Sequence, residues 1–185
     1  LGVAYIKGLQ GEGEYLRTAA CAKHFAVHSG PEALRHEFDA EASAKDMEET
    51  YLPAFEGLVK EAKVEAVMGA YNRTNGEPCC GSPTLQKKLR GEWKFQGHFV
   101  SDCWAIRDFH EHHMVTDTAV ESAALAINNG CDLNCGNTYL HIMKAYEKGL
   151  VTEETITRAT VRLFTTRYLL SLIHISEPTR RTPIS

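Results

Sequence analysis

Residues with complementary chemistry interrupt or end three short apolar runs of the sequence. They are Lys23 and His24 in the first run, Met68 and Tyr71 at the end of the second, and Asp102 at the end of the third. A carboxylate beside a phenol, an ammonium group and an imidazole suits a polyhydroxylated ligand, because these partners can donate hydrogen bonds. The lysine charge would favour the ionised form of the aspartate. An ionised, oriented aspartate is what a glycosidic nucleophile requires.

Each of these groups also has a plain structural explanation. Aspartate is a preferred helix N-cap, and Ala105 and Ile106 after Asp102 could begin a helix. Lys23 and His24 could be the exposed end of a strand, since adjacent strand residues point to opposite faces. The order of the elements along the chain bears on this choice.

The apolar patterns predict four strands, over 21–27, 64–71, 97–101 and 131–133, with helices between them. Such alternation predicts a parallel sheet with right-handed crossovers. Four units are too few to close an eight-stranded barrel, which leaves a small open α/β domain or half of a barrel. Because the chain starts inside a helix, we favour the C-terminal part of a (β/α)8 TIM-type barrel, incomplete in this chain. Strand ends converge on one mouth in a barrel, which would bring the three groups together.

Local signals place the helices between these strands. One helix is expected within 1–18, and the segment 40–62 is expected to hold two helices, because Pro53 suits the first turn of the second. Further helix starts are expected at Ser82-Pro83, at Asp117 with Gly130 closing that helix, at Asn137 with Leu140, Met143 and Tyr146 following, and at Thr152.

Composition narrows the classes of partner. The 185 residues carry a formal net charge of −4, which does not favour nucleic acid as a partner. No apolar run approaches the ~20 residues of a transmembrane helix. The tail 171–185 lacks periodicity, contains Arg180-Arg181 and does not read as native protein, so it is excluded from the fold argument.

The cysteines and histidines do not form a recognisable metal-binding pattern. The chain is too large for a disulfide-stapled mini-protein, and no CxxC pair occurs, so structural or free thiols are favoured. His110, His112 and His113 could ligate a metal, but a polar loop is the simpler interpretation. We expect neither a metal nor another cofactor. The six cysteines are Cys21, Cys79, Cys80, Cys103, Cys131 and Cys135.

Four motifs in order, with fitting spacing, resemble the glycoside hydrolase family 3 β-glycosidases over roughly residues 1–170. They are Lys23-His24-Phe25, Asp46-Met47-Glu48-Glu49-Thr50-Tyr51-Leu52-Pro53-Ala54-Phe55, Val67-Met68-Gly69-Ala70-Tyr71-Asn72 and Val100-Ser101-Asp102. The cysteine-containing segments 78–82, 101–103 and 131–136 look closest to the bacterial β-xylosidase branch.

The resemblance implies a fragment of a retaining exo-β-glycosidase that releases terminal β-linked xylose or glucose from oligosaccharides or from aryl and alkyl glycosides. Asp102 would be the catalytic nucleophile. Lys23 and His24 would hold sugar hydroxyls, Tyr71 would orient the nucleophile, and Met68 would line the pocket. The β-glucosidase members carry tryptophan directly after the nucleophile, whereas here Cys103 precedes Trp104, which favours a xylosidase.

The resemblance also implies parts that this chain does not contain. In other members a second domain supplies the acid/base and the first half of the barrel supplies further sugar-binding residues. We therefore expect 1–170 to be a partial N-terminal barrel domain that is inactive alone, and an extracytoplasmic location. The alternative is a non-catalytic sugar-binding or structural α/β domain in which Asp102 is a helix cap.

Overall fold

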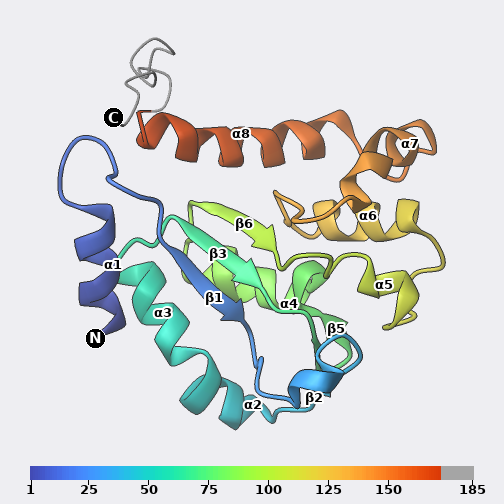
Figure 1. Ribbon diagram of the computed structural model, residues 1–185, viewed down its shortest axis with the longest axis horizontal. Helices are drawn as coiled ribbons and strands as arrows, with labels where there is room; N and C mark the ends of the chain where they lie inside the picture. The colour runs from blue at the N-terminus through green and yellow to red at the C-terminus, as the bar shows by residue number, and fades with distance from the viewer. Residues whose placement is uncertain (172–185) are drawn as a thin grey trace, which may run out of the picture.

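The computed structural model describes residues 1–171, which form a parallel sheet surrounded by helices (Figure 1). The sheet has three strands, in the order β1 (Cys21–Phe25), β3 (Ala66–Gly69) and β6 (His98–Ser101). A single parallel bridge between Val100 and Leu133 extends it beyond β6. Neighbouring strands therefore follow one another in chain order, and the predicted parallel α/β architecture is confirmed.

The core lies between this sheet and the helices that cover it. Phe25, Val67 and Phe99, one from each strand, are fully buried. Phe25 meets Phe99 edge-on, with ring centroids 6.5 Å apart, and meets Phe55 of a covering helix at 5.0 Å. All residues of β6 are buried, which is typical of a parallel strand covered on both faces.

The helices bring their apolar sides to this core. In Figure 1, α1 and α3 lie side by side against one side of the sheet, and α8 crosses the amino-terminal ends of β3 and β6. The hydroxyl of Thr166 on α8 donates to Glu65 at 2.7 Å and lies 2.8 Å from His98. The α-helices are α1 (Gly2–Gln10), α2 (Ala44–Asp46), α3 (Pro53–Lys60), α4 (Pro83–Gln86), α5 (Asp108–Glu111), α6 (Ala119–Asn128), α7 (Ile142–Glu147) and α8 (Glu153–Leu169). Helical segments of other pitch are η1 (Glu32–Leu34), η2 (Met47–Tyr51), η3 (Cys79–Gly81), η4 (Lys87–Glu92) and η5 (Thr138–His141).

Several local signals placed helix starts correctly. Pro53 is the first residue of α3. The hydroxyl of Ser82 accepts a hydrogen bond from the backbone of Leu85 at 3.0 Å, and Thr152 caps α8 in the same way at 3.2 Å through the backbone of Thr155. These caps satisfy backbone N–H groups that have no partner within the helix.

The predicted cap of α6 is wrong by one residue. Thr118, not Asp117, occupies the N-cap, and its hydroxyl accepts from the backbone of Glu121 at 3.3 Å. The carboxylate of Glu121 in turn accepts from the backbone of Asp117 at 2.9 Å. This reciprocal Thr-x-x-Glu pairing is a stronger start signal than a single aspartate. The C-terminal signal is confirmed, because Gly130 follows the helix with a φ of 88°.

The first helix lies within the expected range 1–18 and ends at Gln10. Two other expected elements are shorter or differently built than predicted. The segment 131–133 contributes only the bridge at Leu133. The helix after Asn137 begins as η5 and continues as α7, and this change of pitch alters which side chains face inward. As a result Leu140, Met143 and Tyr146 are exposed, whereas Ile142 and Ala145 are buried.

A second small sheet was not predicted. It joins β2 (Asp39–Ala40) in parallel to β4 (Arg73–Thr74), which pairs with β5 (Glu77–Pro78) in an antiparallel hairpin. Strands of two residues carry no readable periodicity. This sheet anchors the end of the long loop 26–38 beside the carboxyl end of β3.

Two further expectations concern membrane-spanning helices and the C-terminal tail. Among residues 1–171, no helix has the length and apolar character needed to cross a bilayer. Apart from Ser171, the tail 171–185 lies outside the described residues.

Candidate functional site

Asp102 lies directly after β6 and is buried, with 8% of the residue exposed. Its backbone N–H donates to Gly69 at 3.2 Å, which continues the pairing with β3 past the strand end. One carboxylate oxygen accepts from the backbone of Cys103 at 2.8 Å. No helix starts here, because 103–107 form turns and Arg107 is the N-cap of α5. The helix-cap explanation of Asp102 is therefore wrong.

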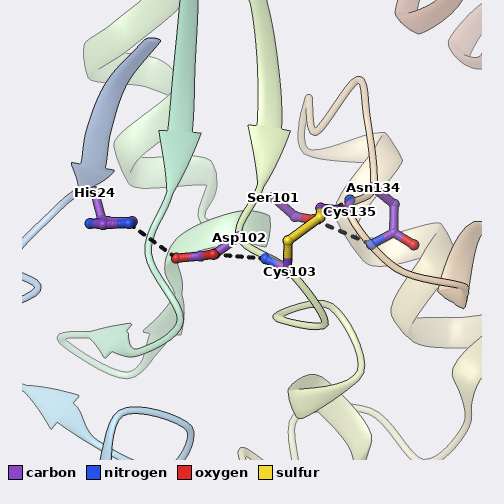
Figure 2. Close-up of a disulfide and its surroundings, with 6 residues drawn as sticks. All are labelled: His24, Ser101, Asp102, Cys103, Asn134 and Cys135. Atoms are coloured by element: carbon purple, nitrogen blue, oxygen red, sulfur yellow. Dashed lines mark hydrogen bonds and ion pairs between the residues drawn. A yellow bond between two sulfur atoms is a disulfide. The ribbon is translucent and has the colours of Figure 1, made fainter. Parts of the chain in front are cut away.

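His24 faces the other oxygen of this carboxylate from β1, as Figure 2 shows. The distance between His24 Nε2 and Asp102 Oδ2 is 3.3 Å. Burial lowers the pKa of His24, and the charge of Asp102 partly opposes that shift. The imidazole is accordingly neutral at neutral pH. It can hydrogen-bond to Asp102 without neutralising its charge.

Tyr71, just past the end of β3, interacts with the same aspartate. Burial raises the pKa of Tyr71, and both the charge of Asp102 and a hydrogen bond with its carboxylate raise it further. The phenol therefore keeps its proton and donates it toward Asp102. The Arg35 guanidinium, 5.2 Å from the centroid of the Tyr71 ring, opposes this pKa shift.

Lys23 and Met68 have less direct places in this arrangement. Lys23 is exposed on β1, and its side chain forms no hydrogen bond or ion pair within the described range 1–171. Its charge is close enough to lower the pKa of His24. Met68 is half-buried on β3, in register with Val100 of β6. The fold thus brings His24 and Tyr71 each into contact with Asp102, with Lys23 on β1 and Met68 on β3.

A disulfide between Cys103 and Cys135 fixes the turn that carries Asp102, and the sequence did not predict this pairing. The two Cα atoms are 4.4 Å apart. Ser101 Oγ accepts from the backbone of Cys135 at 3.0 Å and from the Asn134 amide at 3.2 Å. Figure 2 shows these contacts joining the turn after β6 to the segment around Cys135. The only available signal was that both cysteines sit in turns after neighbouring strands.

The remaining cysteines are free thiols, as expected. Cys79, Cys80 and Cys131 are buried and Cys21 is exposed. Burial raises the pKa of Cys79 to about 11 and that of Cys131 to about 12. Thiols held in this state are structural rather than reactive.

A polar cluster next to Tyr71 was missed at the sequence level. His36 Nδ1 lies 2.7 Å from the carboxylate of Asp108, whose side chain is only 1% exposed. His113 is buried, and neither of its ring nitrogens has a hydrogen-bond partner among the described residues. Within 1–171, no group of three or more His, Cys, Asp or Glu side chains has an arrangement that could hold a metal ion.

This geometry defines what the site can do. A buried carboxylate at the end of a core strand is contacted by two neutral hydrogen-bond donors and lies near an ammonium group. These contacts orient the carboxylate, and an oriented carboxylate oxygen is what nucleophilic attack on an electrophilic carbon requires.

Comparison with known proteins places the chain in a family context. Residues 1–166 match the glycosyl hydrolase family 3 N-terminal domain. A xylan 1,4-β-xylosidase of Xylanibacter ruminicola is 45% identical over 91% of the chain, and a β-xylosidase/α-L-arabinofuranosidase of Medicago sativa subsp. varia is 39% identical over 88%. The chain spans 20% and 22% of the lengths of these two relatives.

Solved structures of glycosidases have a similar fold over the length of this chain. The chain superposes on a family 3 exo-β-xylosidase, in complex with a xylobiose aziridine activity-based probe, with a TM-score of 0.88 and 30% identity. That match covers 92% of the chain and 23% of the other protein. A β-glucosidase of Listeria innocua in complex with isofagomine matches with a TM-score of 0.85 and 28% identity, over 100% of the chain and 26% of that protein.

Proposed function

The chain belongs to the glycosyl hydrolase family 3 N-terminal domain family, and from that premise we propose that it is part of a retaining exo-β-glycosidase. The enzyme removes terminal β-linked xylose or glucose from oligosaccharides. The observation that carries the proposal is the placement of Asp102 at the carboxyl end of β6, in contact with His24 and Tyr71.

Asp102 is the nucleophile in this proposal. Its carboxylate attacks the anomeric carbon, the bond from that carbon to the leaving oxygen breaks, and a glycosyl ester forms. Water then hydrolyses the ester with overall retention of configuration. The acid that protonates the leaving group comes from a part of the enzyme outside this chain. This makes the 1–170 segment inactive by itself.

The other site residues bind the sugar and orient the nucleophile. Lys23 donates hydrogen bonds to sugar hydroxyls, which explains why the lysine head group is left exposed at the strand end. His24 binds a sugar hydroxyl through its other ring nitrogen, which accepts a hydrogen bond when Nε2 donates to Asp102. Met68 supplies an apolar wall, and Tyr71 holds the carboxylate in position. Among the two sugars we favour xylose, because the curated relatives quoted above are named xylosidases.

The sheet fits a barrel that this segment forms only in part. Its strands are parallel and follow one another in chain order without reversal, which is the order of a (β/α)8 barrel rather than of a doubly wound sheet. We place residues 1–170 as the C-terminal part of that barrel.

We also place the enzyme outside the cytoplasm. The Cys103–Cys135 disulfide supports this location, since structural disulfides persist mainly in oxidising compartments. Cell fractionation with an antibody against the chain tests it, and recovery of the protein with cytosolic markers would contradict it.

The decisive experiment uses the full-length protein that carries this chain. Aryl β-xyloside and aryl β-glucoside are assayed with the wild type, with Asp102→Ala and with Asp117→Ala as an exposed aspartate control. We expect Asp102→Ala to lose at least about 10³-fold in kcat/KM, because the covalent step needs this carboxylate. The control should keep wild-type activity.

Covalent labelling separates this function from the alternative of a non-catalytic sugar-binding domain. A 2-deoxy-2-fluoro xyloside with a good leaving group should add one glycosyl unit per protein, on the peptide that contains Asp102. Full activity of Asp102→Ala on both substrates, or a protein that binds sugar without taking up label, would refute the proposal.

A further inference from the structure

A buried carboxylate with no role in the proposed mechanism lies on the segment that follows the nucleophile. Oδ2 of Asp108 faces His36 Nδ1 at 2.7 Å. Its other oxygen has no hydrogen-bond partner in the described part of the chain, and His112 Nε2 is 3.7 Å away. Burying a carboxylate with an unsatisfied oxygen is unfavourable. Because burial of Asp108 is unfavourable, we expect its contact with His36 to contribute something besides packing.

The contacts of His36 fix which of its nitrogens carries the proton. Arg35 Nε lies 3.2 Å from His36 Nε2 and, as a guanidinium nitrogen, can only donate. His36 Nε2 must therefore present a lone pair, and the proton must sit on Nδ1, where Asp108 accepts it. Asp108 thus holds the imidazole in the one tautomer that can accept from Arg35.

Arg35 and His36 both pack against Tyr71. The Arg35 guanidinium carbon is 5.2 Å from the centroid of the Tyr71 ring, and the His36 ring meets Tyr71 edge-on at 4.7 Å. Tyr71 in turn interacts with the Asp102 carboxylate. A continuous set of contacts therefore runs from Asp108 through His36 and Tyr71 to the proposed nucleophile.

We propose that His36 and Asp108 form a positioning pair for the nucleophile. The pair holds Arg35 over the Tyr71 ring and Tyr71 against Asp102. This inference rests on the proposed function, since it deepens the role of the same site. The pair itself touches neither substrate nor the reacting atoms. Its effect is on geometry, and small displacements of a reacting group can cost about 10²-fold in rate.

The position of Arg35 affects the strength of the hydrogen bond from Tyr71 to Asp102 through its charge. The guanidinium lowers the pKa of Tyr71 against the larger effects that raise it. A more acidic phenol is a stronger hydrogen-bond donor to a carboxylate. Loss of Arg35 from the ring would weaken the hold on Asp102 even if the backbone stayed in place.

A structural role is the competing explanation. His36 and Asp108 are 72 residues apart, so their contact also ties the loop after β1 to the segment after β6. A structural pair would affect folding and sugar binding as much as attack by the nucleophile. Separate measurement of binding and of covalent attack distinguishes the two explanations.

The test measures inactivation of the full-length protein by the 2-deoxy-2-fluoro xyloside. The rate constant kinact reports attack by Asp102, and KI reports binding of the sugar. We expect Asp108→Asn to lower kinact about 10-fold to 100-fold with KI within about 3-fold of wild type. An asparagine amide can donate to His36 Nδ1, which moves the ring proton to Nε2 and removes the acceptor for Arg35 while preserving shape.

Companion variants keep the inference falsifiable. His36→Ala and Arg35→Gln should lower kinact similarly, and His36→Gln should recover part of the loss, because an amide can both donate to Asp108 and accept from Arg35. His141→Ala changes an exposed histidine on η5 and should match the wild type. The amount of label at completion gives the concentration of folded sites.

The outcomes separate this inference from the function on which it rests. Unchanged kinact in Asp108→Asn and His36→Ala, or a loss that disappears after correction for folded sites, overturns the positioning role alone. A larger rise in KI than fall in kinact also overturns it. Label on a residue other than Asp102 in the wild type overturns the proposed function.

Discussion

At the scale of single residues, the side chains that contact the Asp102 carboxylate are uncharged. Burial lowers the pKa of His24 and raises that of Tyr71, so each contacts the carboxylate as an uncharged donor. A cationic partner in direct contact would stabilise the carboxylate in the resting enzyme and so oppose attack. Neutral donors orient the carboxylate without forming an ion pair with it.

Removing the phenol of Tyr71 tests this arrangement. We expect Tyr71→Phe to reduce kcat/KM of the full-length enzyme about 10-fold to 100-fold, because a hydrogen bond to a charged group contributes about 1.5–3 kcal/mol. Steady-state assays with an aryl β-xyloside measure the change. Tyr5→Phe is the matched control, since Tyr5 is exposed on α1. Equal activities of the two variants would show that the Tyr71 hydroxyl has no orienting role.

His113 is a residue whose burial makes stability depend on pH. Its side chain stacks on Phe109, with centroids 6.2 Å apart, and burial lowers its pKa from 6.5 to about 4. Between these two values the unfolded state binds more protons than the folded state. His113 therefore leaves the free energy of unfolding unchanged above pH 6.5, and lowers it as the pH falls from 6.5 toward 4.

Replacing His113 by an apolar ring should remove this acid sensitivity. Between pH 7 and 4.5, we expect the free energy of unfolding of His113→Phe to fall about 2–3 kcal/mol less than that of the wild type. Denaturant unfolding of the full-length protein at both pH values measures the difference. His141→Gln, at an exposed position, should behave as the wild type. An identical pH dependence in His113→Phe would assign the acid sensitivity to other groups.

At the scale of elements, β6 and the turn after it form the centre of the site. Pairing with β3 fixes the backbone of Asp102 from one side. The Cys103–Cys135 disulfide and the contacts of Ser101 fix it from the other. The turn that carries the proposed nucleophile is therefore held by β3 on one side and by the segment around Cys135 on the other.

Loss of the disulfide should lower stability. The bridge closes a loop with a sequence separation of 32 residues. The chain-entropy model gives about 3–4 kcal/mol for a loop of this size. We expect the double variant Cys103→Ser/Cys135→Ser to show a lower Tm in differential scanning calorimetry, and its Tm to be insensitive to reductant. Cys21→Ser, which removes an exposed free thiol, is the control. Equal Tm values for the double variant and the wild type would contradict this.

At the scale of the whole molecule, one buried ion network connects η4 and α8 to the sheet. Asp132 accepts from Arg90 at 2.6 Å, from Arg162 of α8 at 3.2 Å and from the backbone of Phe99 in β6 at 2.9 Å. Burial lowers the pKa of Arg90 to about 10, and the charge of Asp132 opposes that shift. Asp132 is thus the counter-ion that allows two guanidinium groups to pack against the sheet.

Removing this counter-ion should destabilise the whole domain. We expect Asp132→Ala to lower the free energy of unfolding by about 3–5 kcal/mol, because it leaves a buried guanidinium without its partner. Urea unfolding monitored by circular dichroism measures the loss. Glu41→Ala, at an exposed acidic position, should change stability by less than about 0.5 kcal/mol. A loss in Asp132→Ala no larger than in this control would mean that the network contributes little.

The sequence by itself determined the local elements and which strand ends carry the candidate site residues. Apolar runs located β1, β3 and β6, and caps such as Ser82 and Thr152 located helix starts. Such signals are readable because each depends on residues a few positions apart. They also place the candidate residues at strand ends, where parallel topology makes them converge.

Tertiary structure alone decided which side chains pair. Cys103 with Cys135, His36 with Asp108, and Arg90 with Asp132 are separated by 32, 72 and 42 residues. No periodicity in one sequence records such partners, because their contact depends on how the sheet and the loops after its strands pack. The same packing excluded the helix-cap role of Asp102, since the chain after β6 turns toward Cys135 before α5 begins.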